Sequence, residues 1–442
     1  MKLKLISLGC SKNLVDSEHL LKQIEYAGVT IVKGEEPYSA DTALSPLDVV
    51  VINTCGFIKD AKEESVNTIL EAVVAKKRGF VRKIVVFGCL SQRYKEELEQ
   101  ELPEVDAFFG AFDIKTVAKY IGIPPREDLS LRRYLTTPRH YAFLKISEGC
   151  DRRCSYCAIP FIRGPHISVP MEDLIEEASS LAKEGVKELI VIAQDTTYYG
   201  IDLYGKRMLA ELLRRLCKIE GIEWIRIHYS YPASFPKDVI EVMASEEKIC
   251  KYLDIPLQHA STKMLKVMHR NINAESTQRL IDRLRVKIKG IVLRTTMIVG
   301  FPGEDAAEFN KLLSFVKKNR FERLGAFTYS QEEGTYGAAH YRDTVRESTK
   351  RGRYNALMEL QSGISLEINV KRIGEVERVL IDSVSSGVFT ARSRKESPDV
   401  DGEIHIKVPE GMKEPHKLIG TFVMVRITGA DEYDLEAEFD SL

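Results

Sequence analysis

The stretch that decides the fold is YAFLKISEGCDRRCSYCAIPFIRG, residues 141–164. It begins with a short apolar run that is typical of a buried β-strand. Three cysteines follow, Cys150, Cys154 and Cys157, with three and then two residues between them. Spacing this tight lets one loop bind three irons of a [4Fe-4S] cubane through thiolates. Because no fourth cysteine lies nearby in the sequence, one iron keeps an open position where a substrate can bind.

Zinc is the alternative ligand for these cysteines. A zinc site needs a fourth ligand, in a second cysteine pair or from a nearby histidine. His166 is the only histidine close by, and a single histidine in a loop is more often solvated. The spacing, with Tyr156 before the last cysteine, resembles the signature of radical S-adenosylmethionine (SAM) enzymes. In that superfamily the open iron binds the amino and carboxyl groups of SAM.

The residues that follow alternate between strand-like and helix-like patterns. The strand-like runs after the cysteine loop are residues 186–194, 223–230, 251–258, 291–300 and 323–330. With the strand before the cysteines they make six βα units, which suit a partial (β/α)6 barrel better than a closed eight-stranded one. Polar groups at the strand ends are expected to face the site: Gln194, Asp195, His228, Gln258, His259 and Glu304. For the two histidines, a structural role and a substrate-facing role both stay open.

Three more cysteines lie in the first 125 residues, each directly after an apolar strand-like run. These runs end at Cys10, Cys55 and Cys89, and each is followed by a helical pattern. Such alternation predicts an open parallel α/β sheet, and ligands bind at the carboxyl edge of such sheets. A glycine beside each cysteine lets the backbones approach closely. We therefore favour a shared cluster or metal site over simple packing of the thiols, with zinc as the next alternative.

The remaining segments are less informative about chemistry. Residues 124–140 are polar and proline-rich and predict a linker. The short strands after residue 369 predict a small antiparallel β-barrel. From Val370 onward there are ten Lys or Arg and fifteen Asp or Glu, a net charge of −5. An acidic module suits a basic partner such as a ribosomal protein better than nucleic acid, although an acidic surface also serves solubility alone. Cys217 and Cys250 are assigned to packing.

Composition limits the class of protein. The 442 residues are 44% hydrophobic and 29% charged, which predicts a folded globular chain. The net charge of −1 gives no overall basic field for nucleic acid. No apolar run approaches the roughly 18 residues of a transmembrane helix. We expect a cytoplasmic protein with no membrane partner.

Several motifs together resemble the methylthiotransferase family of radical SAM enzymes. They include SLGCSKNLVDSE, VINTCGFI, GCLSQRY, RIHYSYP and LDIPLQHAS. The resemblance implies an N-terminal domain with an auxiliary cluster (1–125), a radical SAM core (136–368) and a TRAM domain (369–442). RIHYSYP and LDIPLQHAS favour the branch that methylthiolates the β-carbon of an aspartate in small-subunit ribosomal protein S-twelve, free or in the subunit. The MiaB-type branch, which modifies isopentenyladenosine in tRNA, is the alternative.

The resemblance also implies roles for individual residues. One [4Fe-4S] cluster is held by Cys150, Cys154 and Cys157, and an auxiliary one by Cys10, Cys55 and Cys89. SAM is both methyl donor and radical source, with Tyr156 near its adenine and Gln194 and Asp195 near its methionine or ribose end. No side chain acts as an acid or base, because an unactivated C–H bond is too weak an acid. An electron donor such as flavodoxin or ferredoxin is implied.

Two departures from the family pattern and two other functions remain. Ser168-Val169 stands where the family often has Ser-Arg, and the loop at residues 35–46 is longer than usual.

A non-enzymatic iron–sulfur or zinc protein is disfavoured, because two cysteine triads and a barrel exceed what electron transfer needs. Plain radical methylation is disfavoured because it needs no sulfur donor, which the N-terminal cysteines would supply.

Overall fold

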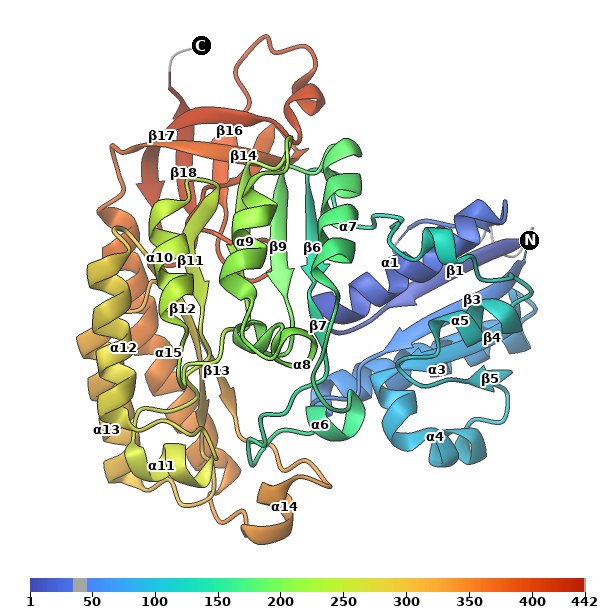
Figure 1. The fold of residues 1–442 in the computed structure, drawn as a ribbon, viewed down its shortest axis with the longest axis horizontal. Helices are drawn as coiled ribbons and strands as arrows, with labels where there is room; N and C mark the ends of the chain where they lie inside the picture. Colours follow the sequence, from blue (N-terminus) through green and yellow to red (C-terminus); the bar gives the residue numbers. More distant parts are fainter. Residues whose placement is uncertain (35–45, 441–442) are drawn as a thin grey trace.

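The computed structural model describes residues 1–34 and 46–440. It contains an N-terminal sheet with its helices, a larger central sheet, and a C-terminal barrel, coloured blue, green to orange, and red in Figure 1. The loop expected at residues 35–46 lies, except for Pro46, outside the described residues.

The N-terminal sheet is parallel throughout, with strand order β2-β1-β3-β4-β5, as predicted. Its strands are β1 (Lys2–Ser7), β2 (Thr30–Ile31), β3 (Leu47–Thr54), β4 (Val81–Gly88) and β5 (Ala107–Phe108). Its helices are α1 (Ser11–Tyr26), α3 (Lys59–Lys77), α4 (Cys89–Glu101) and α5 (Ile114–Tyr120). Val50 and Ile84 pack on one face with α3, and Val51 and Phe87 on the other with α1 and α5. Helices on both faces explain why β3 and β4 are apolar at successive positions.

The central sheet has six parallel strands in the order β13-β12-β11-β10-β9-β6, which confirms the partial barrel. Its strands are β6 (Tyr141–Lys145), β9 (Glu188–Ile192), β10 (Trp224–Ile227), β11 (Ile249–Asp254), β12 (Val292–Val299) and β13 (Arg323–Thr328). The outer helices are α7 (Met171–Lys183), α9 (Leu209–Cys217), α10 (Lys237–Ser245), α12 (Ala274–Lys287), α13 (Ala306–Asn319) and α15 (Glu347–Val370). Shorter elements are η1 (Glu127–Leu129), β7 (Ser147–Glu148), α6 (Ile159–Ile162), β8 (Ile167–Ser168), η2 (Thr196–Tyr198), α8 (Ile201–Tyr204), α11 (Thr262–Val267) and α14 (Tyr336–His340).

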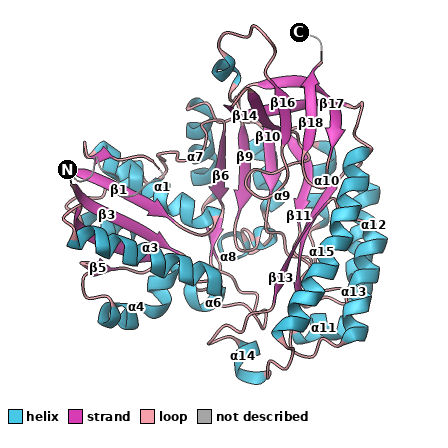
Figure 2. Ribbon diagram, turned by 180° about the vertical axis from the view of Figure 1, so that it is seen from behind, coloured by secondary structure: helices cyan, strands magenta, loops and turns pink. Residues whose placement is uncertain are grey.

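Side chains of the central strands alternate between two environments. Leu144, Leu189 and Val191 belong to the large apolar core under the outer helices. Phe143 and Ile190, one residue away, point to the other face and pack against Val15 of α1. Helix α1 of the N-terminal part therefore covers the inner face of the central sheet near its β6 edge, and Figure 2 shows these elements from behind.

The C-terminal barrel is closed, in the order β14-β15-β16-β18-β17. Its strands are β14 (Val376–Ser385), β15 (Val388–Arg392), β16 (Ile404–Lys407), β17 (Phe422–Ala430) and β18 (Leu435–Phe439), with η3 (Pro415–Leu418) before β17. The barrel was predicted as antiparallel, and four of its five strand pairs are; β16 and β18 pair in parallel. The polar segment from β17 to β18 is too short to carry a crossover, so β18 returns beside β17 and meets β16 in the same direction.

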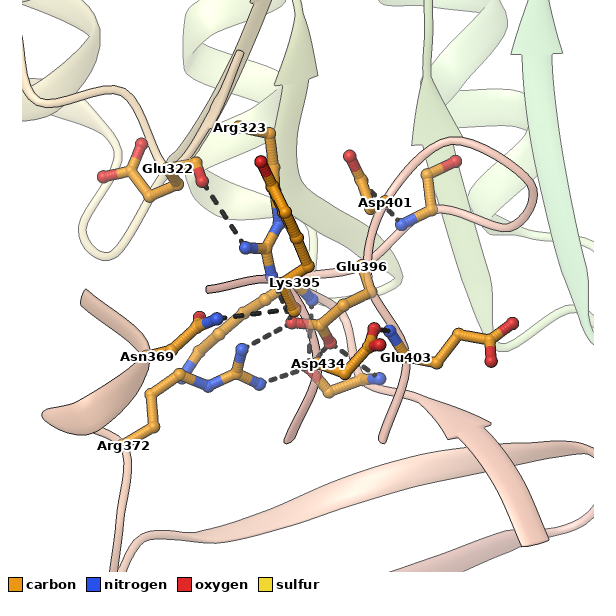
Figure 3. Close-up of polar contacts among 12 residues, drawn as sticks. Glu322, Arg323, Asn369, Arg372, Lys395, Glu396, Asp401, Glu403 and Asp434 are labelled. Carbon is orange, nitrogen blue, oxygen red and sulfur yellow. Dashed lines mark hydrogen bonds and ion pairs between the residues drawn. The ribbon is translucent and has the colours of Figure 1, made fainter. Parts of the chain in front are cut away.

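The segment between β15 and β16, residues 393–403, joins the barrel to the central sheet, and we call it the junction loop. Glu396 of this loop is buried and accepts hydrogen bonds from Arg323 at 3.0 Å and from Arg372 (Figure 3). Burial disfavours its charged form, but the two guanidinium groups outweigh that and hold its pKa well below the usual range. Asp401 accepts a hydrogen bond from the hydroxyl of Tyr252 at 2.7 Å. The barrel is thus fixed to the core by buried, paired charges.

No helix in residues 1–34 or 46–440 is long and apolar enough to cross a membrane.

Candidate functional site

Cys10, Cys55 and Cys89, the N-terminal triad, lie at one edge of the N-terminal sheet. Each follows the carboxyl end of its strand, β1, β3 or β4. Gly9 has a φ of 88°, and a Cβ at this position would lie 2.7 Å from the Cβ of Cys55 and 3.0 Å from its sulfur. A Cβ on Gly56 would meet the backbone of Leu90 at 2.7 Å. The glycines beside the cysteines therefore let three separate loops approach one another.

Two buried asparagines tie these loops together. Asn13 donates hydrogen bonds from its amide to the carbonyl oxygens of Leu8, at 3.0 Å, and Thr54, at 3.1 Å. Asn53 donates to the carbonyl oxygen of Asn13 at 2.8 Å and to the hydroxyl of Ser17 at 2.9 Å. The segments before Cys10 and Cys55 are held in one register by these bonds.

Cys150, Cys154 and Cys157, the core triad, lie on a single loop after β6 and β7. Gly149, with a φ of 69°, is obligatory there, because a Cβ would lie 1.9 Å from the carbonyl oxygen of Pro165. The Cys150 sulfur accepts a hydrogen bond from the backbone N–H of Arg152 at 3.4 Å. The Cys154 sulfur accepts one from the guanidinium of Arg270 at 3.3 Å. Two of the three thiols thus meet a hydrogen-bond donor, one from the loop itself and one from Arg270.

A buried arginine connects the two triads. The side chain of Arg163, 2% exposed, reaches from the segment after α6 into the N-terminal part. Its Nε lies 3.2 Å from the Cys89 sulfur, and it donates to Asp16 at 2.9 Å and to Glu148 at 3.1 Å. Glu148 precedes the core triad by two residues, so this one side chain contacts both cysteine regions.

A second group of ion pairs connects the N-terminal part to the central sheet. Glu332, buried in the segment after β13, accepts hydrogen bonds from Lys62 at 2.8 Å and from Arg93 at 3.1 Å. Lys62 lies on α3 and Arg93 on α4, which begins at Cys89. The carboxyl edges of the two sheets are therefore held facing each other at two separate points.

Burial and positive charge act in opposite directions on the thiols. Burial raises the pKa of Cys55 to about 11 and that of Cys150 to about 12. It also raises the pKa of Cys89, where Arg163 opposes the shift, and the pKa of Cys157. Since metals bind the thiolate, cationic groups beside these sulfurs favour the form that serves as a ligand.

The donor set fits iron–sulfur clusters. All eight cysteines are free thiols. Among the described residues, no three His, Cys, Asp or Glu side chains converge closely enough to hold one metal ion. A cubane requires no such convergence, because each thiolate binds a different iron. Three free thiols with nearby N–H donors, repeated at two places, are the donor chemistry that such clusters use.

The three side chains expected near SAM all lie beside the core triad. The Tyr156 hydroxyl is 3.3 Å from the Arg270 guanidinium. Gln194 donates from its amide to Glu148 at 2.6 Å, and its own amide oxygen is buried without a partner in the described structure. Asp195 accepts from Arg152 at 2.8 Å and from the backbone N–H of Thr197 at 2.9 Å. An unpartnered acceptor on Gln194 is what an incoming ligand donor would use.

The remaining histidines singled out at strand ends and the two remaining cysteines are all buried. His228 is buried and bonded to Ser397 of the junction loop at 2.9 Å. His259 is buried between Glu304, at 3.2 Å, and the backbone N–H groups of Ala260 and Ser261. These contacts favour the structural role for both histidines, which the sequence left open beside a substrate-facing one. Cys217 packs in the core at the end of α9, as expected. Cys250, also assigned to packing, is buried inside β11.

Sequence reasoning missed the cations. Arg163 and Arg270 each touch a triad sulfur, and Arg133 is buried between Glu18 and Glu177 within the segment expected to be a simple linker. Lys12, two residues after Cys10, is also buried. Only Lys12 carries a sequence signal, because it lies in the first helical turn after a strand-end cysteine.

Three family models match separate parts of the chain. Residues 2–110 match the "Uncharacterized protein family UPF0004". Residues 144–316 match the "Radical SAM superfamily", and residues 373–439 match the "TRAM domain".

Curated relatives match over nearly the whole length. A "Ribosomal protein uS12 methylthiotransferase RimO" from Bacteroides thetaiotaomicron is 49% identical over 437 residues, 99% of this chain and 98% of the relative. The protein of the same name from Porphyromonas gingivalis is 50% identical, over 99% of this chain and 98% of its own.

Solved structures share the fold at low identity. The radical SAM methyltransferase TsrM from Kitasatospora setae superposes with a TM-score of 0.54 at 15% identity, over 95% of this chain and 82% of its own. The cobalamin-dependent radical SAM enzyme OxsB superposes with a TM-score of 0.51 at 12% identity, over 82% of this chain and 56% of its own.

Proposed function

We propose that this chain, which belongs to the RimO family of ribosomal protein uS12 methylthiotransferases, transfers a methylthio group to the β-carbon of an aspartate in uS12. SAM serves both as methyl donor and as radical source. The observation that carries the proposal is the pairing of two free cysteine triads, on facing sheet edges, by Arg163. Electron transfer alone needs one such site, whereas a reaction that makes a carbon radical and also delivers sulfur needs two.

The core triad would hold the cluster that binds SAM. Membership of the radical SAM superfamily implies SAM and one [4Fe-4S] cluster. That cofactor pair supplies a radical able to remove hydrogen from an unactivated carbon, which no protein acid or base can do. We assign Tyr156, Gln194 and Asp195 to SAM binding because they surround the core triad. The partner for electrons would be a flavodoxin or ferredoxin.

The N-terminal triad would hold the second, auxiliary [4Fe-4S] cluster and present sulfur. There, the chain's own side chains orient the loops that carry the cysteines and neutralise negative charge at a cysteine sulfur. Asn13 and Asn53 fix the loops, and Arg163 donates to the Cys89 sulfur. Glu148, whose charged form burial disfavours, is kept ionised by Lys145 and Arg163, which lower its pKa to about 2. The carboxylate is therefore present at neutral pH to hold both cations.

The charge of the C-terminal barrel supports a protein substrate. Residues from Val370 onward carry a net charge of −5. Binding a nucleic acid needs Lys and Arg to neutralise phosphates, whereas an acidic module complements a basic ribosomal protein.

An anaerobic assay tests the proposal. The protein is reconstituted with iron and sulfide, then incubated with SAM, a reductant and a peptide that copies the aspartate loop of uS12. A gain of about 46 Da on the peptide, a methylthio group replacing hydrogen, is the expected result. The same gain on tRNA but not on the peptide would move the chain to the MiaB-type activity. 5′-Deoxyadenosine formed without change to either substrate would refute the substrate assignment.

A further inference from the structure

Lys12 is a buried cation that lies between the two parts of the site. It is in the first turn of α1, two residues after Cys10, and only 7% exposed. Its Nζ lies 3.2 Å above the ring centre of Tyr229, which follows β10 at the carboxyl edge of the central sheet. Lys12 thus reaches from the edge of the N-terminal sheet to the edge of the central sheet.

Two other buried cations at this interface are paired with carboxylates. Arg163 is bonded to Asp16 and Glu148, and Arg133 to Glu18 and Glu177. Within residues 1–34 and 46–440, no carboxylate lies within 4.0 Å of the Lys12 Nζ. Burying an ammonium group is costly unless an anion compensates it. Lys12 is instead compensated by the ring of Tyr229 and, at longer range, by Cys10 and Asp254, with no carboxylate in direct contact.

The acidic groups facing Lys12 are the Tyr229 phenol, the Cys10 thiol, which belongs to the N-terminal triad, and Asp254. Asp254 accepts hydrogen bonds from Arg294 at 3.1 Å and from the backbone N–H of Tyr229 at 3.0 Å. Tyr229 itself has a φ of 56°, an uncommon conformation for an aromatic residue, which the bond to Asp254 holds in place. Asp254 therefore holds the ring of Tyr229 in place beneath Lys12 and is not paired with the Lys12 ammonium.

The surroundings add further donors. Helix α1 begins beside Lys12 with no side chain capping its N-terminus and no acidic residue in its first turn. The hydroxyl of Ser11 is buried without a partner in the described structure. The ammonium and the positive end of a 16-residue helix both favour a carboxylate.

We propose that Lys12 binds the side-chain carboxylate of the target aspartate and so places its β-carbon between the two triads. This inference rests on the proposed function, because it takes the substrate to be an aspartate in uS12. Lys12 then determines specificity: a site built for a charged oxygen rejects the neutral amide of asparagine, which would leave the buried ammonium without an anion.

The test compares binding of two peptides that differ at one residue. Fluorescence anisotropy measures the affinity of the reconstituted holoenzyme for the uS12 loop peptide with aspartate at the target position, and for the same peptide with asparagine. Wild type should prefer aspartate by about 10- to 100-fold. Lys12→Met should bind both peptides alike, and Lys12→Arg should keep most of the preference. Lys59→Met, on an exposed lysine of α3, should behave as wild type.

Each outcome decides the inference. The preference is a ratio within one protein, so partial misfolding of a variant cancels; iron content is measured for each variant as well. A wild-type preference that survives in Lys12→Met, or is missing from wild type, overturns the role of Lys12. If wild type modifies no uS12 peptide, the proposed function fails, and the inference fails with it. Modification by wild type together with an unchanged preference in Lys12→Met defeats the inference alone.

Discussion

The two cysteine triads are built in opposite ways. The core triad lies within eight residues of one loop, whereas the N-terminal triad is drawn from three strand ends separated by 45 and 34 residues. One needs a correctly folded loop, and the other needs a correctly assembled sheet. Local sequence can therefore specify the first, but only tertiary structure can specify the second.

This difference is visible in what supports each triad. The core triad depends on Gly149 and on nearby donors such as the Arg152 N–H. The N-terminal triad depends on asparagines that connect separate strands and on Arg163, which comes from the other sheet. Each triad takes one arginine from a distant part of the chain, Arg163 or Arg270, but only the N-terminal triad also needs side chains of other strands to hold its loops, so we expect it to be the more sensitive to changes far away in the sequence.

Replacing one cysteine of each triad should distinguish the functions of the two triads most clearly. Cys154→Ala should lower 5′-deoxyadenosine formation by at least about 10³-fold, because the core triad acts as a unit. Cys55→Ala should leave that formation in place while abolishing the methylthio product. Both activities are read by mass spectrometry, and Cys217→Ala, outside both triads, should retain both. Loss of deoxyadenosine in Cys55→Ala would contradict the division of labour.

The two glycines give a matched pair. Gly149→Ala and Gly9→Ala each place a Cβ at a positive φ and against neighbouring atoms, and each should cost about 3 kcal/mol or more locally. Iron content should fall by about half in each case, with deoxyadenosine formation lost only in Gly149→Ala. Gly28→Ala, at a φ of 73° with open space around it, is the control for backbone strain alone. Equal loss of iron in all three would show that packing at the triads is unimportant.

The two arginines that touch triad sulfurs allow a finer test. Arg163→Met should lower the free energy of unfolding by about 3 kcal/mol, because it leaves Asp16 and Glu148 short of a partner. It should also lower the midpoint potential of the auxiliary cluster only, since donors to cluster sulfurs raise that potential. Arg270→Met should lower the midpoint potential of the SAM-binding cluster only. Potentials are followed by redox titration with electron paramagnetic resonance; a shift of both clusters in either variant would contradict the assignment.

Removing the asparagine hydrogen bonds between strand segments should give the smallest effect. Asn53→Ala removes two buried hydrogen bonds between strand segments and should cost about 1–2 kcal/mol in denaturant unfolding. Auxiliary-cluster content should fall slightly while the core triad is unaffected. Asn67→Ala, on the exposed face of α3, is expected to change neither property.

Much of this molecule follows from its sequence. Strand-like runs that alternate with helical patterns predicted both sheets, and the cysteines after four of those runs placed both triads at carboxyl edges, because strand periodicity and edge position are local properties. The cations could not be predicted in this way. Arg163 meets Asp16 across 147 residues, and a charged residue in isolation is indistinguishable from one on a solvated surface. His228 was ambiguous for the same reason, since its partner Ser397 lies 169 residues away.

The junction loop has a consequence for biosynthesis. Arg392, the last residue of β15, and the junction loop meet the buried charges of the core: Arg392 bonds Glu188 at 2.7 Å, and the carbonyl of Arg394 accepts from Arg226 at 3.0 Å. Before those residues leave the ribosome, a nascent chain has these core charges in place without all of their partners. The pairing of Glu188 and Arg226 with the junction segment therefore waits for residues 392–394, and a nascent or prematurely terminated chain carries these core charges incompletely paired and is more open to proteolysis.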